Sequence, residues 1–92
     1  MRQVDDIMQK RQRRPTMIKL LLLEDDTMIA SGLVYALTNE GYEVIHCQDV
    51  QSSLEQIKTQ TFQLAILDMQ LPDGNGFEVS EKLKNTDTSV IF

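Results

Sequence analysis

Short apolar runs alternate with amphipathic segments along most of the chain. Leu20 to Leu23 form an unbroken apolar run, as expected for a strand that is buried on both faces of a parallel sheet. Between the apolar runs, hydrophobic residues recur at helical spacing. The pattern predicts strands over 18–23, 42–47, 62–67 and 89–92. It predicts helices over about 28–39, from 49 or 52 onward, and over about 76–85.

The first predicted helix has clear end signals. Asp26 or Thr27 is expected to cap its N-terminus, because a side-chain oxygen there accepts from free backbone N–H groups. Gly41 suits the left-handed position that follows a helix. The apolar stripe of this helix is expected to consist of Ile29, Leu33, Ala36 and Leu37.

The other two helices are expected to start at polar residues as well. Asp49 or Ser52 would begin the second helix, and Asn75 would cap the third. The inward-facing residues are expected to be Val50, Leu54 and Ile57 in the second helix, and Phe77 and Leu83 in the third.

The alternation of strands and helices predicts an α/β fold with a doubly wound parallel sheet and right-handed crossovers. A flavodoxin-like strand order, 2-1-3-4, would place the first and third strands side by side. In such sheets the functional crevice lies beyond the carboxyl ends of the strands, where the strand order reverses. Residues that directly follow the first and third strands are therefore the first candidates for function.

Acidic residues occupy both of these positions. Glu24, Asp25 and Asp26 follow the first strand, and Asp68 follows the third. Neighbouring strands lie about 4.8 Å apart, so Glu24, Asp25 and Asp68 are expected to converge. Clustered carboxylates repel one another, and a hard cation with oxygen ligands such as Mg²⁺ relieves that repulsion. Asp26 fits the helix cap better than a ligand position.

This arrangement predicts phosphoryl chemistry. A carboxylate held beside Mg²⁺ can attack phosphorus while the metal offsets the charge of the phosphoryl oxygens, which would leave an acyl phosphate on Asp68. Taken alone, an acidic run is also typical of a solvated helix start, and an Asp before a Pro-Gly loop is typical of a turn. The placement of both features at strand ends favours the site.

Composition and charge narrow the class of protein. Hydrophobic residues make up 41% and charged residues 25% of the chain, as in ordinary globular domains. Residues 17–92 hold twelve acidic and four basic residues, which argues against nucleic-acid binding by this segment. Cys47 is the single cysteine, and its neighbour His46 would point to the opposite face of the same strand. We therefore expect Cys47 not to be a nucleophile and His46 to be an ordinary strand residue away from the site.

The first sixteen residues, MRQVDDIMQKRQRRPT, do not conform to the rest and are treated as an N-terminal extension. They contain few apolar residues, and Pro15 would interrupt a helix. Met17 begins a stretch that looks like a natural start, and Arg13-Arg14 could be encoded by a ribosome-binding sequence. The extension would then be a translated leader. The alternative is a genuine basic tail that contacts nucleic acid or membrane surfaces weakly.

The motifs LLLLEDD and LDMQLPDGNG, with the α/β pattern between them, resemble the receiver domains of two-component response regulators, most closely the OmpR type. The resemblance covers residues 17–92. It implies a cytoplasmic domain that takes a phosphoryl group from a phosphohistidine of a sensor histidine kinase onto its own Asp68. It implies DNA contact only through an effector domain absent from this chain, and no membrane contact. The implied Mg²⁺ ligands are Glu24 (mostly through water), Asp25, Asp68 and the backbone carbonyl of Gln70, with Pro72 and Gly74 shaping the pocket.

The chain also departs from the family pattern. The Ser or Thr that ends strand four, the Lys that ends strand five, and helices four and five have no counterpart in the 92 residues. We therefore expect a partial receiver domain over 17–92, truncated after strand four. Strand four would be an open edge, and the face around the helix at 28–39 would lack a neighbour. Self-association through either surface is expected.

Two other functions compete with the phosphoacceptor. A degenerate or truncated receiver could act as an interaction module that does not depend on phosphate; Mg²⁺ affinity separates the two hypotheses. A phosphatase of the haloacid dehalogenase type requires an Asp-x-Asp motif after the first strand. The sequence there is Glu24-Asp25-Asp26-Thr27, which lacks that spacing.

Overall fold

The computed structural model describes residues 17–92, and the predicted extension at residues 1–16 lies outside the described residues. Strands and helices alternate along the described chain, as the hydrophobic pattern predicts. The elements are β1 (Lys19–Leu23), α2 (Thr27–Asn39), β2 (Glu43–Cys47), α3 (Val50–Thr59), β3 (Leu64–Leu67), α4 (Gly76–Leu83) and β4 (Ser89–Ile91).

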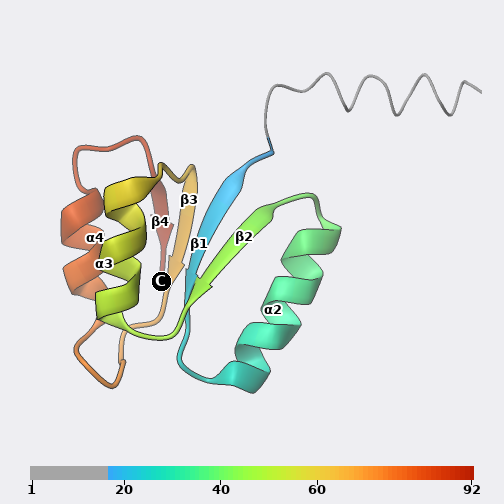
Figure 1. Ribbon diagram of the computed structural model, residues 1–92, viewed down its shortest axis with the longest axis horizontal. Helices are drawn as coiled ribbons and strands as arrows, with labels where there is room; N and C mark the ends of the chain where they lie inside the picture. The colour runs from blue at the N-terminus through green and yellow to red at the C-terminus, as the bar shows by residue number, and fades with distance from the viewer. Residues whose placement is uncertain (1–16) are drawn as a thin grey trace, which may run out of the picture.

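The strands form one parallel sheet in the order β2-β1-β3-β4, which confirms the flavodoxin-like order predicted from the sequence. Helix α2 covers one face of the sheet, and α3 and α4 cover the other (Figure 1). The doubly wound architecture is therefore confirmed. Strand β3 is shorter than predicted, because the ladder begins at Leu64 rather than at Phe62.

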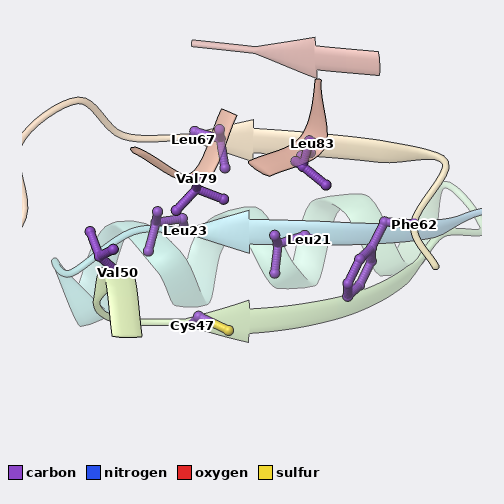
Figure 2. Close-up of a cluster of buried hydrophobic side chains, with 9 residues drawn as sticks. Leu21, Leu23, Cys47, Val50, Phe62, Leu67, Val79 and Leu83 are labelled. Carbon is purple, nitrogen blue, oxygen red and sulfur yellow. The ribbon is translucent and has the colours of Figure 1, made fainter. Parts of the chain in front are cut away.

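The four leucines of β1 form the centre of the core, since each is at most 1% exposed. Leu21 and Leu23 point toward α3 and α4, where they pack with Phe62, Leu67 and other apolar residues (Figure 2). Leu20 and Leu22 face α2. Full burial of one leucine side chain contributes roughly 1.5–3 kcal/mol. An unbroken apolar run is thus what a central strand covered on both faces requires.

Helix α2 packs on a different stripe from the predicted one. Ile29 is 53% exposed and Ala36 is exposed, so the predicted stripe is wrong at these two positions. The two stripes share Leu33 and Leu37, and sequence spacing alone does not distinguish them. The sheet selects the stripe at i, i+3, i+4 and i+7, which consists of Ala30, Leu33, Val34 and Leu37.

Helix α4 also differs from its prediction. It ends at Leu83 rather than at residue 85, because Lys84 leaves helical geometry and Asn85 adopts a left-handed conformation with φ 70°. Phe77, predicted to face inward, is 53% exposed. Val79 takes that place and is fully buried, four residues before Leu83 on the same face.

The predicted helix starts agree with the structure. Asp26 caps α2, Asp49 caps α3 and Asn75 caps α4, each accepting backbone N–H groups of the first turn. Gly41 has the expected positive φ of 101° after α2. Within residues 17–92, no helix combines the length and apolar character needed to cross a membrane.

Cys47 is buried in the core between the sheet and α3, on the face opposite to that of His46. Burial raises the pKa of its thiol above the ordinary 9.0, although Ser53 and Ser52 lower it in part. Because the thiolate is the nucleophilic form, this environment makes Cys47 a poor nucleophile, consistent with the sequence prediction.

The raised pKa of Cys47 predicts a pH dependence of stability. Above pH 9.0 the unfolded chain releases the thiol proton while the folded chain keeps it, so stability declines as pH rises toward the folded pKa. The protonated thiol therefore makes its full contribution to stability below pH 9.0. We expect the free energy of unfolding to fall more steeply above pH 9 in the natural chain than in Cys47→Ala. Urea titrations of both proteins at several pH values around and above 9 measure the free energy of unfolding. A decline of the same steepness in both proteins would contradict the prediction.

Candidate metal centre

The ends of β1 and β3 lie side by side at the carboxyl edge of the sheet. Leu23 pairs with Leu67 in the parallel register, and the backbone N–H of Asp68 donates to the carbonyl of Leu23 at 3.0 Å. Glu24 and Asp68, the next residue of each strand, therefore leave the sheet at the same level. The positions follow directly from strand order and register.

Three carboxylates meet at this edge. Side-chain oxygens of Glu24, Asp25 and Asp68 lie within 4.8 Å of one another. Asp25 is exposed, while Glu24 and Asp68 are half-buried against the ends of the strands. The structure thus brings together the three acidic side chains that the sequence places at adjacent strand ends. Their spacing is short enough for one small cation to contact all three.

No basic side chain of residues 17–92 forms an ion pair with these carboxylates. Among the described residues, an ion pair joins Lys84 Nζ and Glu81 Oε1 at 3.9 Å, on the last turn of α4 and just beyond it. Like charges at such short distances repel one another, and the repulsion favours a bound divalent cation. The three carboxylates offer only oxygen ligands, and Asp25 among them faces solvent. Such a site suits Mg²⁺, which retains several bound waters.

Asp26, the third acidic residue of the run, has a different role. Its Oδ1 accepts the N–H groups of Met28 and Ile29, each at 3.0 Å, and so begins α2. Its own N–H donates to Glu24 Oε2 at 3.0 Å. The cap therefore holds the side chain of Glu24 beside the site, and Asp26 lies outside the cluster as predicted.

The loop that follows Asp68 folds back on itself. Leu71 and Gly74 exchange backbone hydrogen bonds, with N–H to oxygen distances of 3.0 and 3.3 Å. Gly74 sits in this turn with φ 154°, a conformation that L side chains rarely adopt. Gln70 is exposed between Asp68 and this turn. That its backbone carbonyl binds the metal stays a prediction.

Gly76, the first residue of α4, lies against the backbone of Asp68. A methyl group there would collide with the carbonyl oxygen of Asp68 and lie 3.1 Å from its carbonyl carbon. It would also lie 3.2 Å from Cβ of Leu67. Only glycine allows α4 to begin so close to the end of β3. Gly76 therefore fixes the position of Asp68 from the side of α4.

Asp73 is a residue of the site that sequence reasoning missed. Its Oδ1 accepts the N–H of Val50 at 2.8 Å, and its Oδ2 accepts the N–H of Gln51 at 3.0 Å. Both carboxylate oxygens thus bind the first turn of α3, where the helix dipole also favours negative charge. The contact ties the loop after Asp68 to α3. An Asp between Pro and Gly predicts a turn, and nothing local in the sequence indicates a bond to a helix 22 residues away.

His46 is a second residue with an unexpected contact. Its Nε2 lies 2.8 Å from the backbone carbonyl oxygen of Glu24. The prediction that His46 lies away from the site is therefore wrong. The sequence places His46 one residue before the end of a strand, but it does not show where the end of β2 lies relative to the end of β1.

Comparison with known proteins agrees with this geometry. The sequence model of one protein family, the response regulator receiver domain, matches residues 20–92. Response regulator RR06 of Streptococcus pneumoniae is 36% identical over 66 residues, covering 72% of this chain and 30% of that protein. The transcriptional regulatory protein AfsQ1 of Streptomyces coelicolor is 37% identical over 71 residues, covering 77% and 32%. The alkaline phosphatase synthesis regulator PhoP of Bacillus subtilis is 35% identical over 66 residues, covering 72% and 28%. The chain spans about a third of the length of these relatives.

Solved structures give the same result. The response regulator TrrA of Thermotoga maritima, crystallised with Mg²⁺ and BeF, superposes with a TM-score of 0.74 at 28% identity and covers 80% of this chain and 66% of that one. The receiver domain of a LuxO-type repressor of Vibrio parahaemolyticus gives 0.75 at 30% identity, covering 82% and 59%. Sequence motifs, strand order and these comparisons agree, and the chain belongs to the response regulator receiver domain family.

Proposed function

We propose that Asp68 accepts a phosphoryl group from a phosphohistidine of a sensor histidine kinase, with Mg²⁺ bound at the adjoining carboxylates. The observation that carries this proposal is the convergence of Glu24, Asp25 and Asp68 within 4.8 Å at the ends of adjacent strands, in a chain of the receiver family. Residues 17–92 would thus act as a receiver domain in the cytoplasm.

The proposed ligands divide into direct and indirect ones. Asp25 and Asp68 would contact the ion directly, and Glu24 would act mostly through water. The backbone carbonyl of Gln70 would be a further protein ligand. When bound, Mg²⁺ offsets the negative charge of the phosphoryl oxygens. The TrrA structure with Mg²⁺ and BeF is a precedent for such a site in a relative.

The transfer itself is a displacement at phosphorus. A carboxylate oxygen of Asp68 forms the new P–O bond, the P–N bond to the donor imidazole breaks, and the imidazole keeps the electron pair. The product is an acyl phosphate on Asp68. The backbone of Asp68 is held by its N–H bond to Leu23 and by its contact with Gly76, so the side chain is oriented before the donor arrives. The domain serves as its own substrate, which makes it a signalling domain rather than an enzyme with turnover.

Phosphorylation by a small donor tests the proposal. We expect acetyl phosphate with Mg²⁺ to add one phosphoryl group to the 92-residue chain, and Asp68→Asn to add none. The matched control is Asp87→Asn, an exposed carboxylate in the connection before β4, at the opposite edge of the sheet. It should react like the natural chain. Intact-mass spectrometry gives the result, and a phosphoryl group retained in Asp68→Asn would contradict the proposal.

The proposed partners follow from the same site. TrrA has been solved in complex with the histidine kinase ThkA, which supports a sensor kinase as donor for this chain. Any contact with DNA is assigned to an effector domain and not to residues 17–92, whose acidic residues outnumber the basic ones three to one.

We also predict that the 92-residue chain self-associates. In residues 17–92, β4 pairs with β3 alone, and Ile91, the last residue of this edge strand, is 50% exposed. An unpaired edge with apolar neighbours promotes strand pairing between copies, and a charge there prevents it. Sedimentation velocity at micromolar concentration should detect oligomers that Ile91→Lys reduces severalfold. Thr59→Lys, at the exposed end of α3, should leave them unchanged, and a natural chain that stays monomeric would contradict the prediction.

A further inference from the structure

The hydrogen-bond ladder between β1 and β2 ends at Glu24. The N–H of Glu24 still donates to the carbonyl of Cys47 at 3.0 Å, one residue beyond the last registered pair of the two strands. If the parallel ladder continued, its next hydrogen bond would run from a backbone N–H just after β2 to the carbonyl of Glu24. The chain turns into α3 at this point, since Asp49 already caps that helix. The ladder therefore cannot satisfy this carbonyl.

The side chain of His46 replaces this backbone hydrogen bond. Its Nε2 lies 2.8 Å from the carbonyl oxygen of Glu24, and both groups are partly buried. A carbonyl oxygen can only accept, so Nε2 carries the hydrogen. Nε2 is a donor both in the neutral tautomer that carries its hydrogen there and in the cation. The bond therefore requires no change in protonation.

The contact fixes the peptide that joins the two acidic residues of the cluster. The carbonyl of Glu24 and the N–H of Asp25 belong to one planar unit, so holding the oxygen sets the direction in which Asp25 leaves β1. Three bonds now hold Glu24: its N–H to Cys47, its carbonyl to His46, and its Oε2 to the N–H of Asp26. Two of the three come from the last residues of β2.

We propose that His46 is a positioning residue of the metal centre, which orients the Glu24–Asp25 peptide so that both carboxylates face Asp68. This inference rests on the proposed Mg²⁺ site and adds an outer contact to it. Outer contacts of this kind hold ligands in a geometry that suits the ion before it binds, and their loss typically weakens metal affinity about 10- to 100-fold. The sheet would thus support the site from the β2 side, and Gly76 from the α4 side.

A pair of substitutions separates this role from simple packing. His46→Leu keeps apolar volume beside α2 but has no donor, and His46→Gln keeps a donor. We expect calorimetric titration with Mg²⁺ to give a dissociation constant about tenfold higher for His46→Leu. His46→Gln should lie within about threefold of the natural chain. The matched control is Val44→Ala, which removes packing two residues earlier on the same face of β2 and should leave Mg²⁺ affinity unchanged.

Two further readouts keep the result unambiguous. Thermal melting without metal shows whether each variant is folded, and ¹⁵N spectra of the natural chain should show the His46 hydrogen on Nε2. Equal Mg²⁺ affinity in the natural chain and in folded His46→Leu would overturn the positioning role while leaving the metal site intact. A hydrogen found only on Nδ1 would overturn it too. A natural chain that binds no Mg²⁺ would instead contradict the proposed function, and the role of His46 with it.

Discussion

Gly76→Ala is expected to lower the free energy of unfolding by about 3 kcal/mol, the upper end of the usual range for overpacking a well-packed site. The added methyl group would collide with the carbonyl oxygen of Asp68, which is rigid backbone and cannot move aside as a flexible side chain would. Either α4 or the end of β3 must shift. We therefore also expect phosphorylation of Asp68 by acetyl phosphate to become at least tenfold slower in the molecules that remain folded.

Gly32→Ala is the matched control for this prediction. Gly32 lies within α2, and a methyl group there would meet nothing within 4 Å. Alanine favours a helix interior over glycine by about 1 kcal/mol, so this variant should be more stable than the natural chain. Urea unfolding of both variants gives the comparison. If both substitutions raised stability, the close packing of α4 against Asp68 would be refuted.

Asp25→Asn is expected to weaken Mg²⁺ binding but to stabilise the fold when no metal is present. Removing one of the three converging charges should raise the Mg²⁺ dissociation constant by about a hundredfold, because a neutral amide replaces a charged ligand. In metal-free buffer the same change removes two like-charge pairs, with Glu24 and with Asp68, each worth about 1 kcal/mol at about 4 Å in a water-like dielectric. It should therefore stabilise the fold by about 2 kcal/mol at low ionic strength.

Calorimetry with Mg²⁺ and thermal melting in chelator measure the two effects. Asp87→Asn, in the connection before β4, changes the net charge by the same amount and should alter neither quantity appreciably. A loss of metal-free stability in Asp25→Asn would show that Asp25 makes a structural contact rather than taking part in charge repulsion. An unchanged Mg²⁺ affinity would remove Asp25 from the set of ligands.

The strand order and the position of the acidic cluster could both be predicted from the sequence. Each depends on chain order and on which residues directly follow an apolar run. The unbroken leucines of β1 indicate a central strand, and once β3 is its neighbour the register places Glu24 beside Asp68. The helix caps at Asp26, Asp49 and Asn75 are equally local, since each is satisfied by N–H groups two or three residues away.

Features that depend on the relative placement of distant segments could not be predicted. Ile29 and Phe77 are apolar and fit a helical stripe, yet only contact with the sheet decides which of two overlapping stripes is buried. Asp73 and His46 each bond to backbone groups more than twenty residues away. No spacing rule reveals such contacts, because they arise where segments that are distant in the sequence meet at the carboxyl edge.

The location of the metal site is the central claim, and Mg²⁺ titration followed by backbone amide NMR tests it most directly. We predict saturable chemical-shift changes that are largest at Glu24, Asp25 and Asp68, extend to Gln70, and disappear in Asp68→Asn. Saturable binding whose largest shifts lie elsewhere, for example on α3, or unchanged spectra at millimolar Mg²⁺, would contradict the account.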